Sequence, residues 1–191
     1  MRLGTSLRFI HGSSPDSMAT YHREVAGRGE LSDIPMGVPD ARVQAENLLE
    51  LAATAAAARL DFLMVGDSHA SHYANACAPT PTLARMLAVT GDMPVGLLYL
   101  APFHHPIIAA EQVGTPSAFA NGPVTLILGN GDVSSQFAAF GMSKGSRGKR
   151  TEEQIKVIRR LLDGETVTHE CPYLSIHEAR INPIPPEHTP I

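Results

Sequence analysis

Polar and titratable residues follow each of the four short apolar runs in this sequence. In chain order they are His11, the segment Asp67-Ser68-His69 with His72, the pair His104-His105, and the segment Gly129-Asn130-Gly131. In parallel α/β folds ligands bind at the carboxyl ends of the strands, so these residues are expected to converge on one rim and form an active site there. The alternative for any one of them is structural, because Asp and Asn also cap helices and Gly also makes turns.

A histidine-metal site is one alternative use of this rim. His69, His72, His104 and His105 are candidate neighbours, but metal ligands need a fixed geometry, usually with a carboxylate or thiolate among them. His69 and His72 fall in a predicted loop with no helix to fix their spacing, and no HExxH motif is present. The sequence therefore predicts no metal site.

The sequence gives little support for a nucleotide-binding site or for a cysteine nucleophile. Gly129-x-Gly131 lacks the third glycine of a dinucleotide-binding turn, and there is no P-loop. The basic segment 144–150 is predicted to be a solvated loop before a helix rather than a phosphate site. Cys77 and Cys171 have no histidine–asparagine arrangement around them, so no thiol nucleophile is predicted.

Strands and helices in alternation must position this rim. Strands are predicted over 3–9, 62–65, 95–100 and 124–128. The last three runs are almost continuously apolar, which is typical of parallel strands covered on both faces. Helices are predicted over 40–60, from Thr80-Pro81, from His105-Pro106 through 113, and from a capping box at 151–154 to Gly164. The spacing of the strands fits βαβ units, so the fold class is an α/β sheet.

The helix over 40–60 has a predicted buried stripe, formed by Leu48, Leu51, Ala52, Ala55 and Arg59. Outside the alternation, 11–39 is a long polar connection of the kind that is usually functional or disordered. The segment 166–176 predicts a small hairpin, and the Pro-rich tail 182–191 is expected to be extended. We treat residues 1–191 as a single domain.

Composition excludes several classes of protein. The 191 residues are 43% apolar and 18% charged with a net charge of −4, so no basic surface for nucleic acid is expected. No apolar run is long enough for a membrane span, and the first ten residues lack the features of a signal peptide. Two cysteines are too few to staple a fold of this size, which favours the reducing cytoplasm.

Four segments together resemble a known family. They are 62–69 (FLMVGDSH), Phe103–Pro106 with Glu111-Gln112, 126–131 running to Phe140-Gly141, and 150–170. In this order and spacing, the chain from Asp40 on resembles the luciferase-like flavin-dependent oxidoreductases, which include bacterial luciferase and deazaflavin-dependent dehydrogenases. The resemblance implies a TIM-type (β/α)8 barrel that binds reduced FMN, or alternatively the deazaflavin F420. It also implies monooxygenation of a small organic substrate, or hydride transfer, with a separate flavin reductase as a candidate partner.

The resemblance also assigns roles to residues of the rim. Asp67 and His69 match an acidic residue and a histidine at the reacting edge, so they are the expected catalytic residues. The expected cofactor-binding residues are Leu97 and Leu98, at a bulge near the end of the third strand, with Gly129, Asn130 and Gly131. Phe9, His11 and His72 are expected to line the substrate pocket. Ser68 departs from the family pattern, which often has histidine directly after the acidic residue, so the acid–base role would fall to His69.

The chain contains about four of the eight β/α units of a barrel, plus the hairpin, and ends where a fifth strand would begin. Half a barrel leaves sheet edges and an apolar face uncovered, so we expect a truncated member, a homo-oligomer, or pairing with a second half-barrel. A competing hypothesis is a flavin-binding or truncated barrel protein without turnover. A third is an unrelated α/β enzyme, such as a metal-dependent hydrolase.

Overall fold

The structure, a computed structural model, describes residues 4–7, 41–70 and 78–191. The long connection 11–39 therefore lies outside the described residues. So do Phe9, His11 and His72, which were expected to line the substrate pocket, and Cys77.

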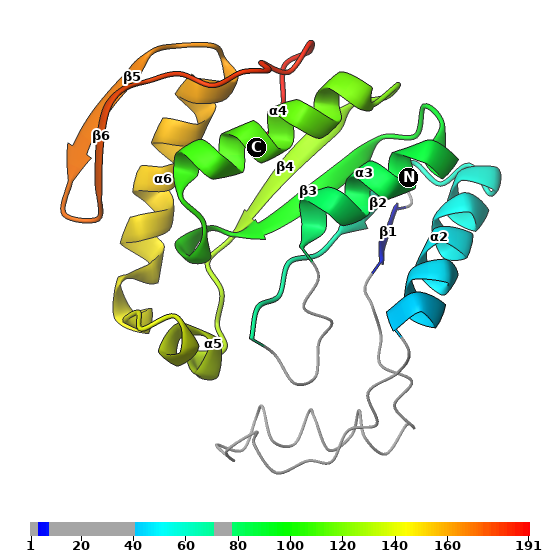
Figure 1. Cartoon of the computed structure of the whole chain (residues 1–191), viewed down its shortest axis with the longest axis horizontal. Helices are drawn as coiled ribbons and strands as arrows, with labels where there is room; N and C mark the ends of the chain where they lie inside the picture. The colour runs from blue at the N-terminus through cyan, green and yellow to red at the C-terminus, as the bar shows by residue number, and fades with distance from the viewer. Residues whose placement is uncertain (1–3, 8–40, 71–77) are drawn as a thin grey trace.

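A parallel sheet of four strands forms the centre of the described chain (Figure 1). The strands are β1 (Gly4–Leu7), β2 (Phe62–Val65), β3 (Val95–Leu100) and β4 (Val124–Gly129), and they are adjacent in chain order. This confirms the predicted parallel α/β sheet. The pairing of β3 with β4 runs unbroken from Val95↔Val124 to Leu100↔Gly129, so the bulge expected near Leu97 is not present in this strand pair.

Helices cover one face of this sheet. They are α2 (Ala41–Ala57), α3 (Pro79–Thr90), α4 (Pro106–Phe119) and α6 (Arg147–Leu162), with the short α5 (Ser134–Ala139) after β4 (Figure 1). Because the strands are in sequential order and βαβ crossovers are right-handed, the crossover helices fall on the same side. Alternate strand residues such as Leu63, Val65 and Leu97 join the helices in one core, whereas Phe62 and Leu98 remain partly exposed. The second face of the described strands is therefore partly rather than fully buried.

Two helix boundaries differ from the sequence prediction. Helix α3 begins at Pro79 rather than after a Thr80 cap, and the Thr80 hydroxyl instead contacts Tyr99 and Gln112. The capping box at Thr151 is wrong as well. Helix α6 already begins at Arg147, after a 3-10 turn, η3 (Lys144–Ser146), and Thr151 is a buried interior residue of it. The basic segment 144–150 is thus helical rather than a loop.

Two further details of the helices were mispredicted. On α2, Leu48, Ala52 and Ala55 are buried as expected, but Leu51 is 53% exposed and Arg59 lies beyond the helix. Helix α4 begins at Pro106 as predicted but runs past residue 113 to Phe119. Gly114 lies in this extension, and the tail passes directly against it, so a Cβ there would overlap the Pro183 carbonyl.

The predicted hairpin is confirmed as β5 (Val167–Cys171) and β6 (Leu174–Ala179), which pair antiparallel and lie against α6 (Figure 1). The tail after it is extended, as predicted. It returns to the main sheet, where the Leu126 amide donates a hydrogen bond to the Pro190 carbonyl at 2.9 Å. The end of the described chain therefore lies beside β4.

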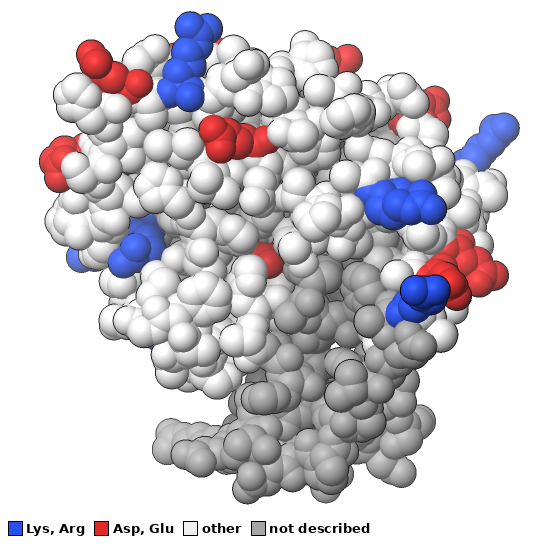
Figure 2. Space-filling model, viewed as in Figure 1, with Lys and Arg blue, Asp and Glu red and all other residues white. Residues whose placement is uncertain are grey.

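Charged side chains are dispersed on the face shown in Figure 2. Lys and Arg alternate there with Asp and Glu among uncharged residues, and the described part of this face carries no patch of a single sign. Among the described helices, none combines the length and the apolar character that crossing a membrane requires.

Candidate functional site

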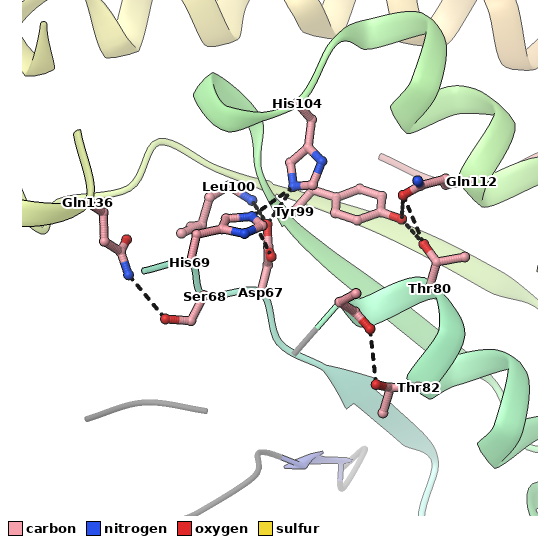
Figure 3. Close-up of polar contacts among 11 residues, drawn as sticks. Asp67, Ser68, His69, Thr80, Thr82, Tyr99, Leu100, His104, Gln112 and Gln136 are labelled. Carbon is pink, nitrogen blue, oxygen red and sulfur yellow. Dashed lines mark hydrogen bonds and ion pairs between the residues drawn. The ribbon is translucent and has the colours of Figure 1, made fainter. Parts of the chain in front are cut away.

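The candidate site is organised around Asp67, which follows β2 at the carboxyl end of the sheet (Figure 3). Its side chain is fully buried and has three neighbours that bear N–H groups. Oδ2 lies 2.7 Å from His104 Nε2 and accepts a hydrogen bond from the Leu100 amide at 2.8 Å. Oδ1 lies 2.9 Å from His69 Nε2. One carboxylate thus joins the ends of β2 and β3.

These neighbours keep Asp67 ionised. Burial by itself would raise its pKa, but the hydrogen bonds from His104, His69 and the Leu100 amide outweigh burial and lower the pKa from 3.8 to about 2. An ionised carboxylate can only accept hydrogen bonds, so the His104 nitrogen that contacts it carries the hydrogen. The same negative charge favours N–H at Nε2 of His69. The Nδ1 atom of His69 is then left to take up or release a proton.

His69 is the more accessible of the two histidines. Its side chain is 25% exposed, compared with 14% for His104, and the two Nε2 atoms are 3.4 Å apart. His104 is fixed further by Gln154 of α6, whose amide donates to the His104 carbonyl at 2.6 Å. The arrangement therefore holds one imidazole rigidly and presents the other at the rim.

Aromatic rings flank His69. Phe103 and Phe140 contact its ring edge-on, at centroid distances of 5.7 and 5.5 Å. Phe103 also packs against Phe137 and Phe140, at 4.8 and 4.7 Å. Phe103 comes from the 3-10 turn η2 (Ala101–Phe103), and the other two belong to α5 and its end. This aromatic wall gives the imidazole an apolar side on which a planar ligand can stack.

A second polar network lies behind His104. The Tyr99 ring is 4.5 Å from the His104 ring, and its hydroxyl contacts Thr80 and donates to Gln112 Oε1 at 3.1 Å (Figure 3). Burial raises the pKa of Tyr99 to about 12, and the nearby negative charge of Asp67 adds to this, although the Thr80 hydrogen bond opposes it. Tyr99 is therefore a neutral supporting residue across the physiological range.

The cofactor-binding residues expected from the sequence fall in different places. Leu97 is fully buried in the core beneath the helices, whereas Leu98 lies on the opposite, partly exposed face of β3. Gly129 ends β4, opposite Leu100, and Asn130 follows it as an exposed residue. Gly131 has φ +66, which favours glycine, and a Cβ there would approach Phe137 and Phe103 at 3.4 and 3.6 Å. The β4 end therefore lies beside the aromatic wall.

The sequence placed His104 and His105 on the rim without giving either a catalytic or binding role, and it did not point to Gln136 or Gln154. His104 and His105 are adjacent, and nothing in the sequence distinguishes them. In the structure His104 turns toward Asp67, whereas exposed His105 caps α4. Ser68, the departure from the family pattern, accepts a hydrogen bond from Gln136 at 3.1 Å and so connects β2 to α5. The side chains of Asp67, His69 and His104 also lie close enough to share a metal ion, with their ligand atoms within 4.8 Å of one another.

Comparison with known proteins identifies a matching family and several relatives. A family model described as luciferase-like monooxygenase matches residues 9–191. The 4-hydroxyprotoasukamycin monooxygenase of Streptomyces nodosus subsp. asukaensis is 29% identical over 121 residues, covering 62% of this chain and 33% of that protein. The oxygenase component of the flavin-dependent trigonelline monooxygenase of Acinetobacter baylyi is 26% identical, covering 63% and 34%. An F420-dependent glucose-6-phosphate dehydrogenase of Amycolatopsis mediterranei is 28% identical, covering 76% and 46%.

Solved structures share the fold. The monooxygenase RslO1 of Streptomyces bottropensis superposes with a TM-score of 0.78 at 18% identity, covering all of this chain (100%) and 52% of that one. The oxygenating constituent of 3,6-diketocamphane monooxygenase of Pseudomonas putida, solved in complex with FMN, gives a TM-score of 0.66 at 19% identity, covering 72% and 39%. The chain spans between about a third and a half of the length of the curated relatives described above.

Proposed function

Because this chain belongs to the luciferase-like monooxygenase family, we propose that it is part of a flavin-dependent oxidoreductase, a monooxygenase acting on a small organic substrate. The observation that carries the proposal is the buried, ionised Asp67 between two imidazoles at the carboxyl end of the sheet. This is the edge at which ligands bind in parallel α/β folds. The aromatic wall beside His69 supports a planar, partly apolar ligand.

His69 is the acid–base residue of the proposal. Asp67 fixes the Nε2 side of the ring, so proton transfer to or from the substrate takes place at Nδ1. His104 is a positioning residue, because it shares the carboxylate and is anchored by Gln154. Since Asp67 stays ionised down to about pH 2, it also stabilises the imidazolium that forms when His69 takes a proton.

FMN or the deazaflavin F420 is the proposed cofactor, in keeping with the FMN complex and the F420-dependent relative. When bound, such a group supplies the electrons for oxygen activation or carries the hydride. The described residues fit a planar ring. Leu98 offers a partly exposed apolar side chain, and Gly131 has no side chain where a Cβ would reach the Phe137 and Phe103 rings, so the backbone there stays open to a ligand. We propose that Leu98, Gly129, Asn130 and Gly131 hold the cofactor. Leu97 supports Leu98 from within the core.

The proposed partners follow from the relatives and from the sheet. Two of the proteins above are named as an oxygenase component and as an oxygenating constituent, which supports a separate reductase for this chain. The sequential parallel strands, with Pro190 hydrogen-bonded to β4, support a (β/α)8 barrel whose next strand forms along β4. Pairing with a second half-barrel or a second copy is the alternative way to cover that edge.

Cofactor binding and turnover, measured separately, test the proposal. The chain is titrated with FMN and with F420 while cofactor fluorescence is recorded, and oxygen consumption is then followed with the reduced cofactor and a panel of small organic compounds. We expect His69→Asn to retain the cofactor Kd of the wild type but to lose about 10²- to 10⁴-fold in kcat, as is usual for removal of a general acid or base. His177→Asn is the matched control, because His177 lies on β6 and its side chain is 83% exposed.

The outcomes separate the competing hypotheses. Binding of neither cofactor would refute the flavin proposal for this chain. Binding without turnover, unchanged in His69→Asn, would favour the flavin-binding protein that lacks activity. Loss of activity on addition of a chelator would support a metal-dependent enzyme instead.

A further inference from the structure

A second cluster of potential ligands lies between the hairpin and α6, on elements other than the strand ends that form the candidate site. His169 and Cys171 are two residues apart on β5, so they share the strand face that also carries buried Val167. That face packs against α6, where Glu153 is half-buried. The imidazole nitrogen, the thiol sulfur and the carboxylate oxygen all lie within 4.8 Å of one another.

A buried imidazole nitrogen lies within the cluster. His169 Nε2 is 2.9 Å from Glu153 Oε2, but among the described residues no partner makes a well-aligned hydrogen bond to it. Their side chains are 18% and 21% exposed, so water has restricted access to the pair. Cys171 forms no disulfide with any residue that the structure describes. The imidazole nitrogen and the carboxylate oxygen thus lie side by side without a well-aligned hydrogen bond between them, which leaves both atoms available to a shared ion.

We propose that Glu153, His169 and Cys171 bind one Zn²⁺ ion, with water in the fourth position. Thiolate and imidazole ligands together favour Zn²⁺ over Mg²⁺ or Ca²⁺, which prefer oxygen ligands only. At usual Zn–S, Zn–N and Zn–O lengths, tetrahedral ligand atoms are about 3.3–3.6 Å apart. Rotamer adjustments of about an ångström bring the three atoms to this spacing. The ion would join the hairpin to α6 and stabilise the folded chain in proportion to its free concentration.

Lys156 provides an internal test of this site. Its ammonium group bonds to Glu153 Oε1, which leaves Oε2 facing His169. The bond orients the carboxylate, but the positive charge opposes a cation nearby. Lys156 is 61% exposed and can move away. Removing the charge in Lys156→Gln should therefore tighten zinc binding several-fold, whereas removing a ligand should weaken it.

Cobalt substitution tests the proposal directly. Co²⁺ is titrated into the untagged chain while the absorption band from thiolate-to-cobalt charge transfer is recorded, and Zn²⁺ is then added to displace it. We expect one equivalent to give the band, Cys171→Ser to abolish it, and Cys77→Ser to retain it, since these are the two cysteines of the chain. His169→Asn and Glu153→Gln should each weaken Zn²⁺ binding at least tenfold, and Zn²⁺ should raise the Tm of the wild type but not of Cys171→Ser.

Controls exclude damage to the fold and binding elsewhere. His177→Asn alters an exposed histidine of the same hairpin and should leave the affinity unchanged. His104→Asn removes a ligand of the other possible metal cluster and should leave the thiolate band intact. Circular dichroism without metal should show the same folded spectrum in every variant. The proposal is overturned if the wild type gives no band, if the band follows Cys77, or if His169→Asn and Glu153→Gln bind Zn²⁺ as tightly as the wild type.

Discussion

The buried carboxylate of Asp67 makes the stability of this protein depend on pH in a way that can be calculated. In the folded state its pKa is about 2, compared with the usual 3.8. One pKa unit corresponds to about 1.4 kcal/mol, so the ionised form contributes about 2 kcal/mol to folding. Because the folded pKa is depressed, this contribution is fully present above pH 3.8 and is lost as the pH falls through 2.

Substitution Asp67→Asn removes the charge and keeps the size of the side chain. At pH 7 we expect the free energy of unfolding to fall by about 2 kcal/mol or more, because two imidazoles and the Leu100 amide lose the negative charge between them. At pH 3 the wild type has itself lost part of the contribution, so the difference between the two proteins should shrink to about 1 kcal/mol.

Urea unfolding followed by circular dichroism at pH 7, 5 and 3 measures this difference. Asp163→Asn is the control, because that side chain is 57% exposed and its removal should cost no more than about 0.5 kcal/mol. A difference between wild type and Asp67→Asn that is the same at pH 3 and pH 7 would refute the reasoning, since the loss would then come from packing and not from charge. A difference below about 0.5 kcal/mol at pH 7 would refute it as well.

Three further predictions concern the elements around the site. Tyr99→Phe should cost about 1 kcal/mol at pH 7 through its lost hydrogen bonds. Between pH 10 and 12 only the unfolded tyrosine ionises, which destabilises the wild type but not the variant, so equal alkaline unfolding of both proteins would contradict this. Gly96→Ala should destabilise by about 1–3 kcal/mol in urea, because the new methyl group overlaps the Phe62 ring, and additional truncation of Phe62 should reduce that penalty. Leu63→Ala in the core should cost about 2–5 kcal/mol, whereas Leu51→Ala, at a 53% exposed position, should cost under about 0.5 kcal/mol. Similar losses would contradict the assignment of Leu63 to the core and of Leu51 to the surface.

Elements set by local pattern were predicted well. The strands 62–65 and 95–100 have the predicted bounds, and the hairpin and the extended tail lie where expected. Continuous apolar runs and turn residues act over a few neighbouring positions, so they can be recognised without knowing the rest of the fold. Capping was predicted less well. The Thr80 hydroxyl contacts Tyr99 and Gln112 instead of capping α3, and Thr151 lies inside α6 because that helix already begins at Arg147.

In the candidate site, too, some residues were predicted from the local sequence and others were not. Asp67 and His69 were selected because they follow a predicted strand, and the structure places the two side chains in contact. His104 was expected on the rim but received no role, because its partner is 37 positions away and its neighbour His105 is chemically identical. Leu97 and Leu98 were selected together, although successive strand residues point to opposite faces and Leu97 lies in the core.

The sequence by itself determined the α/β class, the order of the elements and the rim on which titratable residues gather, because hydrophobic periodicity and turn chemistry are local properties of the chain. Only the tertiary structure decided which histidine shares the Asp67 carboxylate, which leucine of β3 is buried, and that Glu153 meets His169 and Cys171 across the hairpin. These contacts join residues that are distant in the chain. They exist because folding places strand ends and helix faces beside one another, and no local pattern contains that information.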